Sequence, residues 1–326
     1  MLIPLLTVLA AFAVLMWSAD IFVAGAASIA GNLGMSPVVV GLTIVSLGTS
    51  APEILVSVTA ALAGSGGLAI GNAVGSNIAN IGLVLGITVL VVPIQVHPGC
   101  MRSELPTLLV VTAGTGLLLL DVELERSDAI LMLTALVLIL AQMIRSQIRD
   151  PEVAEDAAAE DEDLPHLSPV RAWSAFAVGL ILLVGSSKAL VWGASVIAMK
   201  FGVPELIIGL TIVAVGTSLP ELAATLASAL RGHAEIAIGN IVGSNLFNLL
   251  AVMAMPGLLA PEQLPYNFLF RDYGAMCIAT ILMAAAAYLG LRHRSAKPGH
   301  SYLGRGVGTL FCLGYGLYYY GLYVSL

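Results

Sequence analysis

The segments 48-GTSAPE-53 and 216-GTSLPE-221 each place a glycine, a proline and a glutamate inside a long apolar run. Proline lacks the N–H that a helix interior requires, and its ring clashes with the carbonyl one turn back. Each segment therefore predicts a helix that is broken partway. A carboxylate at such a place is unfavourable in hydrocarbon, and ionisable residues inside membrane spans are typical of functional sites.

The composition is that of a polytopic membrane protein. The chain has 326 residues, of which 59% are hydrophobic and 10% charged, and its mean hydropathy is +0.98. A soluble domain carries about 25% charged residues. Apolar runs of a length that crosses a bilayer predict ten spans. They lie near residues 2–30, 37–63, 68–92, 103–120, 128–147, 171–199, 205–230, 235–258, 273–291 and 305–325.

The net charge of −7 comes from one segment, because residues 150–163 carry eight acidic residues and no basic one. The rest of the chain is close to neutral, which argues against nucleic acid as a partner. We interpret residues 150–170 as a solvated acidic linker between spans five and six, since such a composition cannot form a core. The three cysteines are far apart in the sequence, so neither a disulfide framework nor a zinc site is expected.

Basic residues give the expected orientation. If the linker 150–170 is cytoplasmic, nine Lys and Arg residues fall on the inner side of the membrane and three on the outer side. This bias follows the positive-inside rule. It predicts a multi-pass protein of the plasma (inner) membrane with both termini outside.

An internal repeat underlies the two broken helices. Residues 41–80 align with residues 209–248 at a constant offset of 168, without a gap, and 22 of the 40 positions are identical. The chain thus divides into a first repeat (1–149), the linker and a second repeat (171–326). Each repeat holds five expected spans, an odd number, so the second would enter the membrane from the opposite side. Inverted repeats with interrupted helices are typical of transporters that bind substrate near the midplane.

The broken helices expose oxygen atoms. A break near Pro52 is expected to free backbone carbonyls around Ser46 and Leu47, and such backbone is tolerated only beside a protein-lined cavity. Thr49 and Glu53 are four residues apart and share a helix face. The neighbouring span carries more oxygens in 71-GNAVGSNIAN-80, where the spacing puts Ser76 and Asn80 on one face.

The second repeat contains the same groups, so the joined halves predict an all-oxygen cluster with two carboxylates. Oxygen ligands suit Na⁺, Ca²⁺ or Mg²⁺ and argue against zinc, copper or nickel. Two carboxylates facing one cavity repel each other unless a divalent cation or two monovalent ions neutralise them. An exchange in which either Ca²⁺ or several Na⁺ (or protons) neutralise the same carboxylates is the mechanism that this predicts.

Three alternatives to Na⁺/Ca²⁺ exchange can be compared with the sequence. Ca²⁺/H⁺ exchange could use the same two glutamates, because carboxylates also bind protons. An ion channel could contain a broken helix, but it has no need of an inverted duplication. An intramembrane protease would require a Ser–His pair or two mid-span aspartates, and neither is present in the sequence. No enzymatic activity and no cofactor are expected.

These motifs resemble the alpha-repeats of the sodium/calcium exchanger family, within the cation/calcium antiporter superfamily, and the compact chain is similar to prokaryotic members. The resemblance implies an all-α fold of ten transmembrane helices in two inverted five-helix repeats, with helices 2 and 7 broken. It implies Ca²⁺ export driven by Na⁺ entry, with spans one and six sliding against the other eight. The partners would be inorganic cations and the lipid bilayer, and a monomer would be sufficient.

The resemblance also implies a set of cation ligands. They are Glu53, Glu221, Thr49, Ser50, Thr217, Ser218, Ser76, Asn80, Ser244 and Asn248, with the backbone carbonyls of Ser46 and Ala214. At positions 80 and 248 some family members carry an aspartate, whereas this chain has amides at both.

Other polar residues have structural interpretations. Four further asparagines of the repeats, Asn72, Asn77, Asn240 and Asn245, are expected to tie helices together. Asp20 and Lys188 align at the same offset in spans one and six. We expect them to pair with loop charges or to extend toward the membrane surface.

Overall fold

Helices make up most of the chain in the computed structural model, which describes residues 2–35, 37–64, 66–149, 167–202, 214–264 and 268–324. The helical segments of the first half are α1 (Leu2–Leu33), α2 (Pro37–Val40), the π-helix η1 (Gly41–Val45), α3 (Ser46–Thr49), α4 (Ala51–Leu62), α5 (Gly66–Ala79), the π-helix η2 (Asn80–Leu85), α6 (Gly86–Val91), α7 (Pro98–Arg102), α8 (Glu104–Leu118) and α9 (Arg126–Arg149). Those of the second half are α11 (Pro169–Lys200), α13 (Ala214–Thr217), α14 (Leu219–Leu230), α15 (Ala234–Phe247), the π-helix η5 (Asn248–Val252), α16 (Ala254–Leu259), the π-helix η6 (Phe268–Tyr273), α17 (Gly274–Gly290) and α18 (Arg305–Val324).

Six helices in the described part of the chain are long and apolar enough to cross a membrane, or seven if the bent pair Gly41–Thr49 and Ala51–Leu62 is one span. These correspond to seven of the ten expected spans. Of the other three, 103–120 matches α8, which has 15 residues, and 305–325 matches α18, which has 20. The expected span 205–230 and the acidic segment 150–163 fall wholly or partly outside the described residues.

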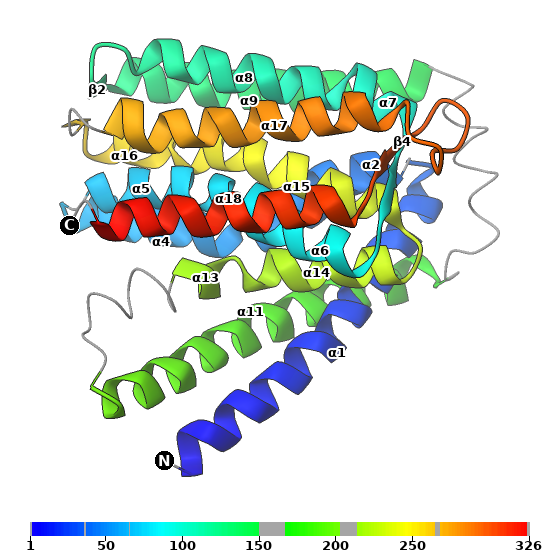
Figure 1. The fold of residues 1–326 in the computed structure, drawn as a ribbon, viewed down its shortest axis with the longest axis horizontal. Helices are drawn as coiled ribbons and strands as arrows, with labels where there is room; N and C mark the ends of the chain where they lie inside the picture. The colour runs from blue at the N-terminus through cyan, green and yellow to red at the C-terminus, as the bar shows by residue number, and fades with distance from the viewer. Residues whose placement is uncertain are drawn as a thin grey trace.

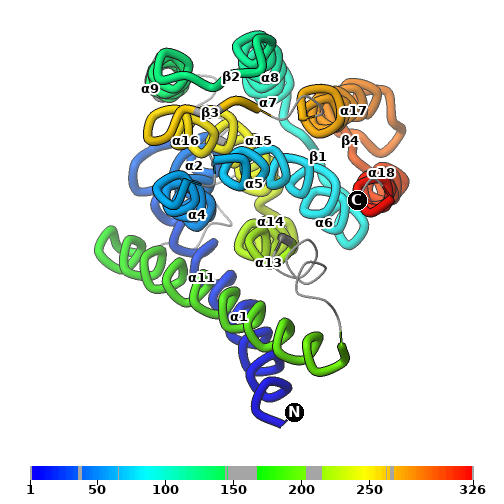
Figure 2. Tube along the Cα trace, turned by 90° about the vertical axis from the view of Figure 1, so that its left-hand side faces the viewer, coloured from blue at the N-terminus to red at the C-terminus, as the bar shows by residue number. Residues whose placement is uncertain are grey.

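Helices α1 and α11 form a separate pair that crosses the other helices obliquely (Figure 1), and the perpendicular view shows both on one side of the molecule (Figure 2). Glycines let the two backbones approach. A Cβ added at Gly25 would lie 2.5 Å from the backbone nitrogen of Phe176, and one at Gly193 would lie 2.8 Å from Cγ2 of Val8. Gly193 is equivalent to Gly25 in the repeat, and Phe176 is equivalent to Val8. The two helices therefore make equivalent contacts on each other where they cross.

Both GTSxPE segments contain the expected break. The helical run through Gly41–Thr49 bends by 49° relative to α4. The residue at the junction is Ser50, with φ −84° and ψ 1°, and its equivalent Ser218 has φ −90° and ψ 4°. In each half the proline is the second residue of the helix that follows, Pro52 in α4 and Pro220 in α14. Proline is tolerated there because the first turn of a helix has no intrahelical acceptor for its N–H.

Two of the π-helices begin at equivalent asparagines. Asn80 is the first residue of η2 and Asn248 is the first residue of η5. A π-turn inserts extra backbone into a helix and is frequent at functional sites. It was not expected from the sequence, which gave only a continuous helical pattern through both positions.

The motif helices occupy the interior. Every residue in the most apolar 18-residue window of the α15–α16 stretch is buried, against 28% in α1 and in α11. Large apolar side chains such as Leu9, Phe12 and Ile181 are more than half exposed on these two helices. Such a surface is stable against lipid, which agrees with a membrane protein.

Two small antiparallel sheets connect segments outside the long helices. The strand β1 (Ile94–Val96) pairs with β4 (Ser301–Leu303), and β2 (Glu123–Leu124) pairs with β3 (Glu262–Gln263). Each sheet joins a loop of the first half to a loop of the second. Strands of two or three residues carry no readable alternation, so the sequence did not predict them.

Candidate cation site

The two motif glutamates are buried at the start of equivalent helices. Glu53 lies in the first turn of α4 and is 1% exposed, and Glu221 lies in the first turn of α14 and is 2% exposed. The positive end of the helix dipole favours a negative charge at this position. Their carboxylates are near enough for their charges to interact with each other.

A hydrogen bond joins the two halves at the breaks. Ser50 Oγ donates to Glu221 Oε1 at 3.3 Å. The second carboxylate oxygen, Oε2, of both Glu53 and Glu221 is buried and has no hydrogen-bond partner among the described residues. Leaving a buried polar atom without a partner costs about 1–3 kcal/mol, more for a charged group. Two such oxygens in one region suit a bound cation.

The hydroxyl groups of the breaks differ between the repeats. Thr49 Oγ1 donates to Asn240 Oδ1 at 3.2 Å, and Ser46 Oγ donates to the carbonyl of Leu42 at 2.5 Å. Ser218 Oγ is buried and has no partner in the described part of the chain. Thr217 lines two cavities, as described below.

The expectation that the break frees the Ser46 carbonyl is wrong in its simple form. The N–H of Ser50 donates to this oxygen at 2.9 Å, because the helix continues through Thr49 before it bends. In the second half the equivalent N–H, that of Ser218, donates to Val215 at 3.1 Å, one residue after Ala214. The hydroxyl of Thr49 also donates to the Ser46 oxygen, at 3.4 Å, so this carbonyl has two donors in the observed conformation.

The expected side chains of the neighbouring helices are also buried, and these helices pack against the two that carry the glutamates. Helix α4 packs against η5, which carries Asn248, and α14 packs against η2, which carries Asn80. Both side-chain polar atoms of Asn248, Oδ1 of Asn80 and Oγ of Ser244 are buried without a partner among the described residues. Ser76 is 5% exposed and lines a cavity. The structure thus brings residues of both repeats together in a crossed arrangement.

Hydrogen bonds tie the helices of each repeat in the same way, which the sequence indicated only in part. Asn72 Nδ2 lies 3.4 Å from Ser57 Oγ, and Asn240 Nδ2 donates to Thr225 Oγ1 at 2.9 Å. Ser57 and Thr225 are hydroxyl residues at equivalent positions outside the two repeated motifs. Asn77 Nδ2 donates to the carbonyl of Asn245 at 3.3 Å and so links the repeats. The expected structural role of these asparagines is confirmed.

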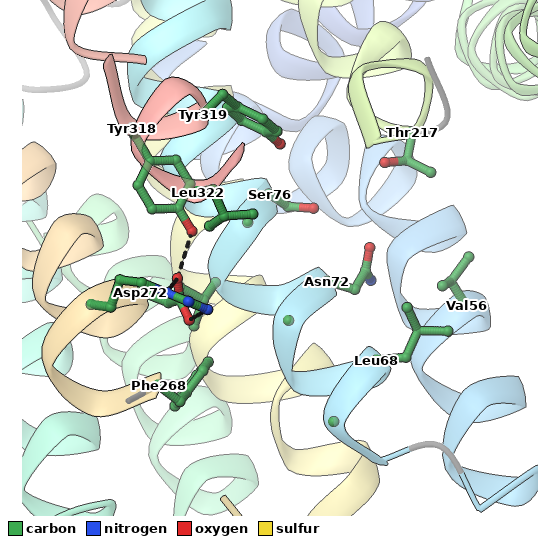
Figure 3. Close-up of a pocket in the computed structure, with 15 residues that line it drawn as sticks. Val56, Leu68, Asn72, Ser76, Thr217, Phe268, Asp272, Tyr318, Tyr319 and Leu322 are labelled. Atoms are coloured by element: carbon green, nitrogen blue, oxygen red, sulfur yellow. Dashed lines mark hydrogen bonds and ion pairs between the residues drawn. The ribbon is translucent and has the colours of Figure 1, made fainter. Parts of the chain in front are cut away.

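A cavity of about 420 Å³ reaches this region from one end of the molecule. Figure 3 shows Asn72 and Ser76 of α5 on one wall and Thr217 across from them. Tyr318 donates to Asp272 at 3.0 Å on the far wall. A second cavity, about 430 Å³, runs beside α11 and is lined by Pro52, Ser187, Lys188, Gly216, Thr217 and Pro220.

Asp20 of α1 and Lys188 of α11, which are equivalent in the repeat, have different surroundings. Asp20 accepts a hydrogen bond from Arg231 Nε at 2.9 Å, so the expected pairing with a loop charge is confirmed. Lys188 is exposed and lines the second cavity.

The chemistry of the buried groups is uniform. Carboxylate, hydroxyl, amide and carbonyl oxygens are present, and the described residues contain no group of three or more His, Cys, Asp or Glu side chains that could hold a metal. Such a set fits a hard cation and lacks the nitrogen and sulfur ligands of transition-metal sites. It carries a formal charge of −2 when both glutamates are ionised.

Several known proteins are similar to this chain in sequence or in structure. A profile of the family described as sodium/calcium exchanger protein matches residues 3–145 and 171–324. CaxA of Alkalimonas amylolytica, named as an antiporter, is 46% identical over 290 residues, or 87% of this chain and 89% of that protein. Sodium/calcium exchanger MaX1 of Methanosarcina acetivorans is 29% identical, covering 81% of this chain and 85% of that protein. A solved structure of the sodium-calcium exchanger NCX_Mj, soaked with zero Na⁺ and Ca²⁺, has a TM-score of 0.81 at 29% identity, covering 97% of this chain and 98% of that one.

Proposed function

The chain belongs to the sodium/calcium exchanger protein family, and we propose that it is a secondary-active antiporter that exchanges Ca²⁺ for Na⁺ through one shared site. The observation that carries this proposal is the pair of buried glutamates. Each has a carboxylate oxygen without a partner among the described residues, and Ser50 links one of them to the opposite repeat. The names of MaX1 and NCX_Mj support the choice of ions.

The architecture behind this function is ten transmembrane helices in two inverted five-helix repeats, residues 1–149 and 171–326, joined by the linker 150–170. Several observations support it. The breaks, the π-helices η2 and η5, and the α1–α11 crossing recur at an offset of 168 residues. Both ends of the chain lie at the same end of the molecule (Figure 1), as an even number of spans requires.

The orientation in the plasma (inner) membrane follows from the basic residues, with both termini outside and the linker cytoplasmic. In this orientation the first cavity opens outward, because it is lined by Leu68 near the start of α5 and by Leu322 near the end of α18. The conformation is then an outward-facing one.

Twelve residues form the proposed site. Glu53 and Glu221 supply the charge, and the other ligands are Thr49, Ser50, Thr217, Ser218, Ser76, Asn80, Ser244 and Asn248 with the carbonyls of Ser46 and Ala214. A single Ca²⁺ or two Na⁺ would neutralise the two carboxylates. The empty site would leave two charges buried and unpaired, and such charges are strongly unfavourable. The loaded protein therefore changes sides more easily than the empty one, which couples the two ions.

We infer that α1 and α11 slide against the remaining helices to expose the site alternately on each side. Their separate layer and glycine-lined crossing support such a movement. The hydrogen bonds of the central helices, such as Asn240 to Thr225, would hold the site together while the pair moves.

The test is ⁴⁵Ca²⁺ uptake by proteoliposomes. Vesicles loaded with Na⁺ are compared with vesicles loaded with K⁺ that carry an imposed pH gradient. Uptake driven by the Na⁺ gradient alone is the expected result. Uptake driven by the pH gradient alone would show that the coupling ion is H⁺ and not Na⁺. This Ca²⁺/H⁺ exchange is the second candidate function, because the same carboxylates can bind protons. Uptake under neither condition would contradict Ca²⁺ as the transported ion.

A further inference from the structure

The hydroxyl of Ser187 makes a contact that the repeat does not duplicate. Ser187 lies on α11 and is 4% exposed, and its Oγ donates to the carbonyl of Gly216 at 2.7 Å. Gly216 is the first residue of GTSLPE, in the short helix α13. The contact therefore joins the crossing pair of helices directly to the broken helix of the second half.

The acceptor is the carbonyl that the break leaves without its usual donor. In a continuous helix the oxygen of Gly216 would bond the N–H four residues later, but that residue is Pro220, which has none. A buried carbonyl without a donor is unfavourable. The close approach is tight as well, since a Cβ at Gly216 would lie within 2 Å of Val191 on the same helix α11.

The equivalent position in the first repeat has no hydroxyl. Ser187 corresponds to Ala19, and Gly216 corresponds to Gly48. At Gly48 the nearest atoms to an added Cβ belong to Leu180, at 3.3 Å, and Phe176, which are both on α11. Helix α11 thus lies against both breaks in this conformation.

The neighbouring serines show that the difference is specific. Ser186 Oγ donates to Leu183 within its own helix at 3.1 Å, and its equivalent Ser18 donates to Leu15 at 3.0 Å. Ser186 and Ser18 thus make the same hydrogen bond in the two repeats, whereas Ser187 is replaced by an alanine, Ala19, in the first repeat.

We propose that Ser187 is a positioning residue that stabilises the conformation observed here relative to the one in which the two repeats exchange roles. The proposal rests on the alternating access proposed above. In the exchanged conformation α1 would lie against the Gly48 carbonyl, where Ala19 offers no donor, and Ser187 would leave Gly216. One hydrogen bond is therefore made in only one of the two states, and it sets their ratio.

Two equivalent positions can report that ratio. Leu68 is 65% exposed and lines the first cavity, whereas its equivalent Ile236 is fully buried. In the conformation in which the two repeats exchange roles, position 236 would be exposed to the cavity and position 68 would be buried. In a background with Cys100, Cys277 and Cys312 replaced by alanine, the variant Ile236→Cys should react with a charged thiosulfonate only in the exchanged conformation. Leu68→Cys reports the observed one.

Ser187→Ala should raise the labelling rate of the Ile236→Cys variant about 3- to 10-fold, the effect of one hydrogen bond on an equilibrium. Ser187→Thr, which keeps the hydroxyl, should restore the original rate, and Ser186→Ala should leave it unchanged. Ala19→Ser supplies a hydrogen-bond donor in the exchanged conformation, so it should also raise the labelling rate of the Ile236→Cys variant.

Equal labelling rates for Ser187→Ala and Ser186→Ala would overturn the proposal, as would failure of Ser187→Thr to restore the rate. Ala19→Ser tests the same idea without altering Ser187, so it decides the matter if Ser187→Ala does not fold. Labelling does not depend on which ion is transported. Absence of Na⁺-driven Ca²⁺ uptake by the wild-type protein would therefore contradict the proposed ions, whereas the labelling rates test the role of Ser187 separately.

Discussion

Ser50 Oγ, at the break of the first repeat, donates a hydrogen bond to Glu221 Oε1 of the second repeat at 3.3 Å. Its equivalent Ser218 is as deeply buried, but its Oγ has no partner among the described residues. The two equivalent serines, Ser50 and Ser218, thus have different environments. One serine already orients a carboxylate, and the other is available to a ligand.

This asymmetry gives a prediction for the two serines. Both Ser50→Ala and Ser218→Ala should weaken Ca²⁺ binding by roughly 10-fold or more, since the loss of a group that binds or orients at a metal site typically has that effect. Only Ser50→Ala should lower the Tm of the ion-free protein, because only Ser50 has a bond to lose there. Ion-free and Ca²⁺-loaded thermal unfolding in detergent measures both effects. Equal ion-free Tm values would contradict the structural difference.

The glutamates give the second prediction. Glu53→Gln or Glu221→Gln reduces the formal charge of the site from −2 to −1, so Ca²⁺ is no longer neutralised and exchange should be abolished. Folding should be retained, because glutamine has nearly the same shape and removes a buried charge. The assay is ⁴⁵Ca²⁺ uptake, with the exposed Glu125→Gln as the matched control. Wild-type uptake by either site variant would remove the central claim.

Much of the local structure of the candidate site could be predicted from the sequence because local chemistry determines it. Pro52 and Pro220 break their helices wherever these lie, and the glutamate that follows enters the first helical turn in both repeats. The separation of two equal motifs by 168 residues also indicates that they meet. These features need only the covalent properties of proline and the symmetry of the repeat.

Other features depend on packing that the sequence does not display. The helix bends after Thr49, and the N–H of Ser50 still donates to the Ser46 carbonyl. A bend one residue earlier would have freed that carbonyl. The π-turns at Asn80 and Asn248 replace α-helix without any change in apolar pattern. The bond from Ser187 to Gly216 exists only because α11 docks on the break.

The amides at Asn80 and Asn248 give the third prediction. Asn248→Asp adds a third carboxylate, so the site requires one more positive charge for neutrality. Its Na⁺ dependence should become steeper at high pH, where the new carboxylate is ionised, and should return toward the wild-type curve at low pH, where it is protonated. Na⁺-dependent ⁴⁵Ca²⁺ flux over a range of pH measures this, with Asn80→Asp as the equivalent in the other repeat. A curve for Asn248→Asp that matches the wild type at every pH would show that this residue does not face the ions.

The fourth prediction compares two equivalent glycines. A Cβ at Gly243 on α15 would lie 2.4 Å from Ser46 Oγ and 2.5 Å from the carbonyl oxygen of Leu42. At the equivalent Gly75 on α5 it would meet no atom of the described residues within 4 Å, and this glycine lines the first cavity. Overpacking a tight contact typically costs about 1–3 kcal/mol, and backbone atoms cannot move aside as a flexible side chain can.

Gly243→Ala should therefore lower the Tm in detergent and the yield of folded protein, whereas Gly75→Ala should leave both near the wild-type values. If alternating access exchanges the roles of the repeats, Gly75→Ala should still slow Ca²⁺ exchange, because its methyl group would prevent the contact that Gly243 now makes. Wild-type Tm with reduced flux is thus the expected combination for Gly75→Ala. Equal destabilisation by both variants would mean that α5 packs as tightly as α15, and unchanged flux in Gly75→Ala would mean that this face never closes.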